Sequence, residues 1–289
     1  MRIDLHSHST HSDGRESVET VFAEAAASNL QVLALTDHDT TAGWSEAQIA
    51  AEKYGVAFVP GIELTTTTHH GVSVHLLAYL PNGENLELQR AMAEVKESRG
   101  TRISRFIENL REGYPDLSHE AVLNGSDPAD KAIGRPHIAD ALVSLGHFSD
   151  RTEAFSGPLN KNSEFYVPND GIDTIKAIGL VRSAGGVAIM AHPLARASKE
   201  FVSSDRVRGH FLELIEAGIG GFEIHHREVG DAARQWMASL AAEFDLITTG
   251  SSDYHGLDGK PNRLGENLTE FRMLERIQES ATGTTIRWV

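Results

Sequence analysis

Hydrophobic and polar positions follow two different periods along the first 80 residues of the chain. Short apolar runs such as QVLALT and VAFVPGIEL have the length of buried strands, and RIDLH and VSVHLLAYL are similar. Between the strands lie segments with helical spacing: one at about 18–28, after the N-cap candidate Ser17, and TAGWSEAQIAAEKYG, which Gly55 ends. Short apolar strands separated by helices predict a parallel sheet covered by helices.

The middle of the chain has a different pattern. From about residue 84 to 165, apolar residues recur with helical spacing, and no convincing strand occurs. The stretch NLELQRAMAEVKESRGTRISRFIENLREG predicts a long helix with a break near Gly100, because glycine weakens helix interiors. We therefore expect an all-helical insertion at 99–162, which divides the remaining α/β part into segments 1–98 and 163–289.

The alternation of helices and strands resumes after the insertion. A helix at about 172–183 precedes the strand GVAIMAH. The pairs FLELIEAG then GFEIHH, and ARQWMASLAAEF then LITTGSSDYH, repeat the order of helix then strand. The whole chain thus offers about seven strands, and its 289 residues suffice for one α/β barrel with an insertion.

The composition excludes several classes of protein. The chain has no cysteine, so any metal must be bound by His, Asp and Glu. A formal net charge of −15 repels long polyanions, so we do not expect binding of duplex nucleic acid. No apolar run approaches the roughly 20 residues of a membrane-spanning helix. Without the pattern of a secretory leader, the expected location is the cytoplasm, away from membranes.

The opening stretch, MRIDLHSHSTHSDG, concentrates metal-binding side chains. His6 and His8 are two residues apart on a predicted strand, so both imidazoles point to one side. Asp13 follows in a loop of small polar residues. Two imidazoles and a nearby carboxylate suit a divalent cation, and the alternative is a frayed N-terminus whose histidines are merely exposed.

Residues of the same chemistry accompany the other predicted strands. The C-terminal ends of parallel strands form the functional edge of α/β sheets and barrels, and a random scatter of 15 histidines would not favour that edge. Taken singly, a histidine within an apolar strand is more often a hydrogen-bonded core residue, whereas a carboxylate at a buried strand end needs a cation or several donors. The residues at or near the strand ends are Asp37, His38, Glu63, His75, His192, Glu223, His225, Asp253 and His255.

The order of these motifs resembles the PHP (polymerase and histidinol phosphatase) superfamily. The resemblance implies a distorted (β/α)7 barrel. A barrel interrupted by a helical insertion that carries GRPH is similar to the branch of stand-alone nucleotide phosphatases and short-oligonucleotide exonucleases. The motifs that carry the resemblance are HSH at 6–8 with Asp13, TDHD at 36–39, GIE at 61–63, His75, GRPH at 134–137, AHP at 191–193 and SDYH at 252–255.

The resemblance also implies a trinuclear site for divalent metal ions, which could be Mn, Fe, Zn or Mg. Asp37 and Glu223 would lie behind the ligands and orient metal-bound histidines. The implied ligand sets are His6, His8 and Asp253 for the first metal, with Glu63 bridging it to the second; Glu63, His75 and His192 for the second; and Asp13, His38 and His255 for the third.

Clustered divalent ions favour displacement at phosphorus. A hydroxide that bridges two metals would be the nucleophile, since coordination lowers the pKa of water to about 7 in favourable cases. The leaving oxygen would take a proton from His192, from His38 or from a metal-bound water, and the sequence leaves these three open.

The insertion would supply selectivity for the substrate. Arg135 could bind a phosphate bidentately, and His137 could assist it near the free backbone N–H groups of a helix that begins there. The alternative is that Arg135 is an ordinary surface arginine before a helix. Arg196 is a weaker candidate for binding substrate phosphate.

These expectations point to a metal-dependent phosphoesterase that acts on nucleotides. It would remove the 3′-phosphate of a nucleoside 3′,5′-bisphosphate, shorten a 5′-phosphorylated single-stranded oligonucleotide from 5′ to 3′, or do both with one pocket. The alternatives are a histidinol-phosphate phosphatase, which the insertion disfavours, and a non-catalytic metal-binding PHP module, which the complete ligand set disfavours. Deamination on an amidohydrolase barrel is a further alternative, against which Asp13 and the TDHD motif count.

Overall fold

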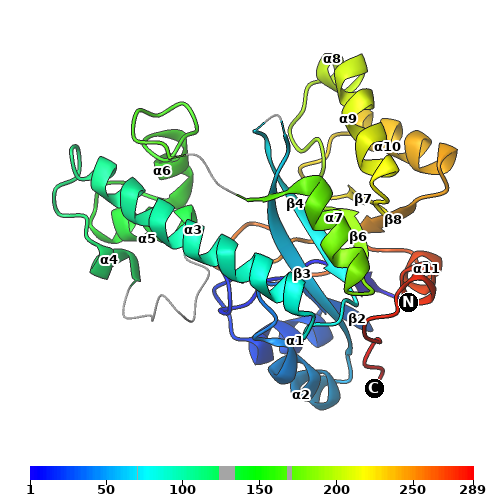
Figure 1. Ribbon diagram of the computed structural model, residues 1–289. Coiled ribbons are helices and arrows are strands. Elements are labelled where there is room, and N and C mark those ends of the chain that lie inside the picture. Colours follow the sequence, from blue (N-terminus) through cyan, green and yellow to red (C-terminus); the bar gives the residue numbers. More distant parts are fainter. Residues whose placement is uncertain (70, 124–133, 168–170) are drawn as a thin grey trace.

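A computed structural model describes residues 1–69, 71–123, 134–167 and 171–289 of the chain. Its strands are β1 (Ile3–Asp4), β2 (Val32–Leu35), β3 (Ala57–Thr67), β4 (Ser73–Tyr79), β5 (Ile172–Asp173), β6 (Val187–Met190), β7 (Gly221–His225) and β8 (Ile247–Gly250). Seven of them lie side by side in the order β1-β2-β3-β4-β6-β7-β8, and the short β5 pairs with β3 outside this path. The sheet curves into a nearly closed barrel (Figure 1).

Residues that follow β1 and β8 join the two ends of the sheet. Ser7 forms a parallel bridge with Tyr254, and the backbone N–H of His8 donates to the Tyr254 carbonyl at 2.8 Å. The hydroxyl of Tyr79, a fully buried residue of β4, donates to the Leu5 carbonyl at 2.8 Å. These contacts fix the segment that follows β1 against the rest of the barrel, and the predicted distorted barrel is confirmed.

One strand runs against the predicted direction. β4 is antiparallel to both β3 and β6, whereas the other neighbours along the path are parallel. Only residues 68–72 connect β3 to β4, and a parallel pair needs a connection of a dozen residues or more, so the expectation of a parallel sheet is wrong here. Because β4 is reversed, its first residues reach the same edge as the last residues of the parallel strands. His75 lies there, paired with Thr65 of β3.

The helices cover the outside of the barrel and form a separate body beside it (Figure 1). Two of the predicted helix ends are confirmed: the Ser17 side chain accepts a hydrogen bond from the Thr20 N–H at 3.2 Å, and Gly55 ends its helix in the left-handed conformation, at φ 67°. The helices are α1 (Val18–Ala27), α2 (Trp44–Tyr54), α3 (Leu86–Leu110), α4 (His119–Leu123), α5 (Arg135–Ser144), α6 (Arg151–Ser156), α7 (Thr174–Ser183), α8 (Lys199–Val202), α9 (Asp205–Glu216), α10 (Asp231–Glu243) and α11 (Phe271–Ser280).

α3 is a single helix of 25 residues that joins the barrel to the insertion. The expected break at Gly100 is wrong, because α3 continues through it. Leu88 and Val95 pack in the core of the barrel, and Ile103 and Phe106 pack in the core of the insertion. Burial on both sides of the glycine outweighs the roughly 1 kcal/mol that glycine costs within a helix.

The insertion has a hydrophobic core of its own. The second half of α3 packs with α4, α5 and α6, and Figure 1 shows these helices projecting to one side of the barrel. Residues 124–133 lie outside the described part of the chain, and the described residues of the insertion hold only helices and their connections, as expected. The division into 1–98, 99–162 and 163–289 stays a prediction, and its first boundary falls inside α3.

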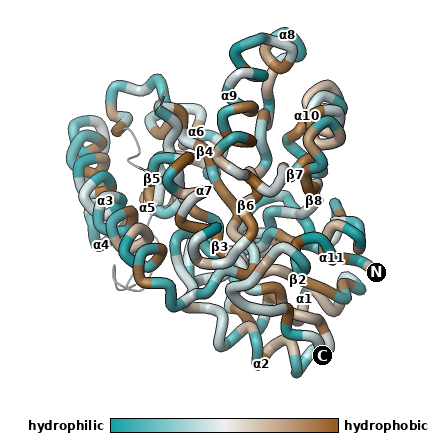
Figure 2. The backbone as a smooth tube through the Cα atoms, turned by 45° about the vertical axis from the view of Figure 1, so that its right-hand side comes forward, coloured by the Kyte–Doolittle hydropathy of each residue, from teal (hydrophilic) through white to brown (hydrophobic). Residues whose placement is uncertain are grey.

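Hydropathy follows this architecture. In Figure 2 hydrophobic colour concentrates on the barrel strands, and hydrophilic colour covers much of α3. Apolar side chains fill the barrel, among them Ile3, Leu5 and Ile189, and Leu274 and Ile277 of α11 pack against them. None of the described helices combines the length and apolar composition that crossing a membrane requires. The packed interior supports the rim of the barrel, where the polar residues gather.

Candidate metal centre

The nine predicted metal ligands converge at one rim of the barrel. Eight of them form three overlapping groups, in each of which one nitrogen or oxygen atom per residue lies within 4.8 Å of the others. The ninth, His192, has its Nε2 at 3.3 Å from Oε1 of Glu63. The three groups are His6, His8, Glu63 and Asp253; His38, Glu63 and His75; and His8, Asp13, His38 and His255.

Glu63 lies in the middle of the cluster, and its side chain is 1% exposed. Its Oε2 atom lies 3.1 Å from Nε2 of both His6 and His8. Its Oε1 atom lies 2.8 Å from Nδ1 of His75 and 3.3 Å from Nε2 of His192. One carboxylate therefore faces imidazoles on two sides, which is the arrangement that a bridge between two cations requires.

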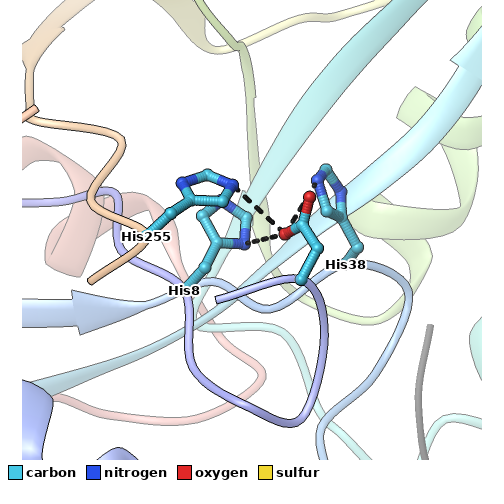
Figure 3. A group of neighbouring side chains, drawn as sticks. His8, His38 and His255 are labelled. Atoms are coloured by element: carbon cyan, nitrogen blue, oxygen red, sulfur yellow. Dashed lines mark ion pairs between the residues drawn. The ribbon is translucent and has the colours of Figure 1, made fainter. Parts of the chain in front are cut away.

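A second carboxylate faces the imidazoles of His8, His38 and His255, which converge in Figure 3. Oδ1 of Asp13 lies 3.1 Å from Nε2 of His255 and 3.8 Å from His8 and His38. This Oδ1 atom, Nδ1 of His38 and Nε2 of His255 are buried without a hydrogen-bond partner in the described structure. Such atoms are costly unless something else satisfies them. A divalent cation between Asp13 and His255 would satisfy Oδ1 of Asp13 and Nε2 of His255, and nitrogen and carboxylate ligands suit Mn, Fe and Zn.

The electrostatics of the cluster favour ionised carboxylates. Burial alone would raise the pKa of Glu63, but His38 and His6 hold it well below its ordinary value. Burial alone would lower the pKa of His8, but its interactions with Asp253 and Glu63 outweigh burial and raise the pKa to about 9. The cluster without metal therefore consists of anionic carboxylates that stabilise positive charge on His6 and His8, whereas burial lowers the pKa of His38 and of His255.

Glu223 is fully buried behind one of these imidazoles. Its Oε1 atom lies 3.0 Å from Nδ1 of His6, and its Oε2 atom accepts a hydrogen bond from the His192 backbone N–H at 2.7 Å. The Ser251 hydroxyl donates to the same carboxylate. Burial opposes ionisation of Glu223, but His6 outweighs it and lowers the pKa to about 2. Glu223 is therefore placed to orient His6, whose Nε2 faces the cluster.

Asp37 acts on the loop that carries Asp13. Its carboxylate accepts hydrogen bonds from the Ser9 N–H (2.8 Å), the Ser9 hydroxyl (2.7 Å) and the Ser12 hydroxyl (2.5 Å). The Ser12 oxygen in turn lies 3.3 Å from Nδ1 of His8. Asp37 thus fixes the loop and acts on His8 only through Ser12, whereas Glu223 contacts His6 directly.

Two side chains at the cluster escaped the sequence analysis. Lys260 donates to Oδ2 of Asp253 at 2.7 Å, and Nε2 of His226 lies 3.7 Å from the same oxygen. Both line a cavity of about 110 Å³ over the cluster. His225, a candidate from its position near a strand end, is exposed instead, because a register shift after Glu223 turns the chain and buries His226. The two adjacent histidines of GFEIHH were a signal in the sequence, but only the first of them was expected at the site.

Arg135 lies between aromatic rings of the insertion. Its guanidinium carbon is 5.5 Å from the ring centre of Phe155 and 5.6 Å from that of Tyr166, and Nη1 donates to the Leu159 carbonyl at 3.2 Å. Arg102 of α3 lies 5.8 Å from the same Tyr166 ring and is 7% exposed. Burial and the charge of Arg135 lower the pKa of Arg102. Within the described residues neither arginine pairs with a carboxylate, so two cations, the buried Arg102 and the half-buried Arg135, lie close to one ring.

The other two predicted phosphate-binding residues make different contacts. Nδ1 of His137 accepts a hydrogen bond from the Gly134 N–H at 3.1 Å, at the N-terminus of α5. The Arg196 side chain is 78% exposed and pairs with Glu228. These contacts bring neither side chain to the metal ligands, and their roles toward substrate stay predictions.

Comparison with known proteins agrees with the chemistry of this rim. Residues 4–130 match the PHP domain. A 5′-3′ exoribonuclease of Haemophilus influenzae is 32% identical over 270 residues, which cover 92% of this chain and 94% of the relative. The chain belongs to the PHP family. A solved structure from Bifidobacterium adolescentis, assigned as a metal-dependent phosphoesterase, has 36% identity and a TM-score of 0.90 over 97% of this chain and 96% of that one.

PHP relatives of similar coverage carry the names of different phosphoesterases. A phosphoribosyl 1,2-cyclic phosphate 1,2-diphosphodiesterase of Eggerthella lenta is 31% identical and spans 91% of this chain and 97% of the relative. A 3′,5′-nucleoside bisphosphate phosphatase of Chromobacterium violaceum is 28% identical and spans 88% and 87%. The prediction of a metal-dependent PHP phosphoesterase is therefore confirmed. The names of the relatives specify different phosphate esters as substrates.

Proposed function

We propose that the protein hydrolyses the ester at the 3′-oxygen of a 5′-phosphorylated nucleotide, with three bound divalent ions. Its substrates are a nucleoside 3′,5′-bisphosphate and a short 5′-phosphorylated single strand, which it shortens from 5′ to 3′. The observation that supports this proposal best is the combination of nine clustered metal-binding side chains with two arginines, the buried Arg102 and the half-buried Arg135, that lack acidic partners among the described residues.

The three overlapping groups of side chains are the proposed binding sites for the ions. The distances support the predicted bridge by Glu63, and they add His8 to the group around Asp13 and His38 to the group around His75. When bound, such ions supply a nucleophile from water near neutral pH and neutralise charge on the phosphoryl oxygens. The protein contributes by fixing the ligands from behind, through Glu223, and by enclosing them at the rim.

Protein side chains also attract the reacting phosphate and protonate its leaving oxygen. Lys260 lines the cavity over the cluster and carries a positive charge there, which attracts a phosphoryl group. His192 and His38 both line that cavity, and His192 is better placed to protonate the leaving 3′-oxygen because its side chain is 26% exposed against 12% for His38.

The arginines of the insertion are the proposed site for the 5′-phosphate. Arg99 of α3 pairs with Asp39 and donates to Thr65, two residues after Glu63. The middle of α3 therefore lies at the edge of the cluster. Arg102 is one turn further on the same face of the helix, about 4.5 Å along its axis, and Arg135 lies across the ring of Tyr166 from it. A nucleotide with phosphates at both its 3′ and 5′ ends matches this arrangement of cluster and arginines.

The two arginines beside Tyr166 also argue against one alternative substrate. Histidinol phosphate carries a single phosphate and a cationic amine, and the amine would meet positive charge at Arg102 and Arg135 without a carboxylate to balance it. A second phosphate, in contrast, would be held by charge-assisted hydrogen bonds. The proposal therefore favours nucleotides with two phosphates over a phosphorylated amino alcohol.

The test compares two substrates in one preparation. Manganese-loaded protein is given adenosine 3′,5′-bisphosphate and a 5′-phosphorylated trinucleotide, and released phosphate and mononucleotides are measured, with Asp13→Ala as the inactive control. We expect hydrolysis of both substrates. Arg135→Gln should raise KM for the bisphosphate and leave KM for adenosine 3′-monophosphate unaffected, whereas Arg151→Gln, beside Asp140 in the same insertion, should change neither. No turnover of either substrate, or full activity of Asp13→Ala, would overturn the proposal.

A further inference from the structure

A cavity of about 780 Å³ opens beside the metal cluster. It is distinct from the 110 Å³ cavity over the cluster, but His75 and His192 form walls of both. Arg102 and Arg135, the proposed site of the 5′-phosphate, do not line it. The reacting phosphate therefore has open space on a side that a nucleoside bisphosphate does not fill.

The walls of this large cavity suit a nucleobase. Phe201 of α8 is 51% exposed at the cavity, and the apolar residues Val207 and Phe211 of α9 are buried behind it. Figure 1 shows α8 and α9 standing beside the barrel on the side away from the insertion helices α4 and α5. The volume falls within the range of roughly 300–1,000 Å³ that is typical of small-molecule sites. An exposed aromatic ring is a stacking surface for any base.

The charged side chains of the large cavity suit a phosphate. Lys161 of the insertion and Arg206 of α9 line it, and among the described residues no aspartate or glutamate does. In the part of the chain that the structure describes, neither cation pairs with a carboxylate, whereas Arg208, two residues further along α9, pairs with Glu243. In a protein with a net charge of −15, two cations facing an apolar cavity attract a phosphorylated ligand.

We propose that this cavity binds the second nucleotide of a single strand, the one joined to the reacting phosphate through its 5′-oxygen. Its base stacks on Phe201, and its 3′-phosphate lies near Lys161 and Arg206. The inference rests on the proposed function. It assigns the nucleotide that follows the cleaved bond to the large cavity.

The bonds that change are consistent with this placement. The oxygen of a water molecule bonds to phosphorus, and the bond from phosphorus to the 3′-oxygen of the first nucleotide breaks. That 3′-oxygen takes up a proton, and the first nucleotide leaves from the side of Arg102 and Arg135. The phosphate stays on the 5′-oxygen of the second nucleotide, so the shortened strand is again 5′-phosphorylated. A bisphosphate undergoes the same bond changes with the large cavity unused.

A ratio of activities tests the inference. The value of kcat/KM for a 5′-phosphorylated trinucleotide is divided by that for adenosine 3′,5′-bisphosphate in the same preparation. Phe201→Ala should lower this ratio on the order of tenfold, the size of one lost base–aromatic stack. Lys161→Ala with Arg206→Ala should lower it as well and weaken its dependence on salt. Phe271→Ala, which removes a 42% exposed ring on α11 outside the cavity, should leave the ratio unchanged.

Cross-linking gives a readout without turnover. A 5′-phosphorylated dinucleotide in which a methylene group replaces the bridging 3′-oxygen, with 4-thiouridine at its second position, is irradiated with the metal-loaded protein. We expect cross-links within residues 194–211. Cross-links elsewhere, or an unchanged ratio in Phe201→Ala while the bisphosphate is still hydrolysed, would overturn this inference alone. If the wild-type protein hydrolyses neither substrate, the proposed function itself fails.

Discussion

Oε1 of Glu223 lies 3.0 Å from Nδ1 of His6, so a fully buried carboxylate sets the direction in which His6 presents Nε2 to the cluster. A partner of this kind typically contributes 10–100-fold to metal affinity or activity. We therefore predict that Glu223→Gln lowers the affinity for manganese by roughly 10–100-fold, measured by competition with a chelator. His225→Gln, two residues away and exposed, is the matched control. Equal manganese affinity of Glu223→Gln and the wild type would show that this contact does not position a ligand.

The raised pKa values of the histidines predict proton release on metal binding. The pKa of His8 is raised to about 9 and that of His6 is raised as well, so the pair, whose Nε2 atoms lie 3.0 Å apart, binds a proton more tightly than free imidazoles in the metal-free protein. Since a metal binds only the neutral imidazole, its apparent affinity should rise with pH up to about 9. Calorimetric titration with manganese in two buffers of different ionisation enthalpy should give different heats. Identical heats would mean that no proton is released.

Asp4 makes the folded protein less stable as the pH rises. Burial raises its pKa to about 6, against 3.8 for the ordinary group. A raised pKa means that the folded state binds the proton more tightly, so the contribution of Asp4 to the free energy of unfolding is largest below pH 3.8. It should fall by about 3 kcal/mol as the pH rises through 6.

The Asp4→Asn variant isolates this contribution. Its unfolding free energy, measured with urea in the presence of a chelator, should lack that decline between pH 4 and 7, although other buried carboxylates add slopes of their own to both proteins. Parallel pH profiles of the variant and the wild type would contradict the assignment.

The ion pair between Arg99 and Asp39 links α3 to the rim of the barrel. Removing the arginine leaves Asp39 buried without its cation, so Arg99→Met should reduce the free energy of unfolding by about 3 kcal/mol. It should also raise KM for the bisphosphate, because Arg102 lies on the same helix. Arg105→Met, at an exposed position of α3, is the control and should do neither. A loss of stability without a change in KM would contradict the prediction that this ion pair also positions Arg102 for substrate binding.

Several features of the site were predictable because they depend on residue type and strand order. Side chains that follow parallel strands meet at one edge whatever the details of packing, so His6, Glu63 and Asp253 could be expected together. His75 reached the same edge by another route, since its strand is antiparallel and presents its start there. In that case the expected place was right although the expected direction was wrong.

Other features depend on contacts that no local pattern encodes. The register shift in β7 decides that His226, and not His225, faces the cluster. α3 passes through Gly100 because two separate cores bury its two halves. Arg102 looks like any surface arginine of a helix until Tyr166 and Arg135 are brought beside it by the fold. Each of these outcomes follows from burial against residues distant in the sequence.

Divalent ions bound by the cluster at the barrel rim are proposed to carry out the hydrolysis. Their role can be measured by titrating chelator-stripped protein with manganese while bound metal and hydrolysis of adenosine 3′,5′-bisphosphate are followed together. We predict no hydrolysis by the stripped protein and full activity only as binding approaches three ions per chain. Hydrolysis by the metal-free protein at the rate of the loaded protein would contradict the account.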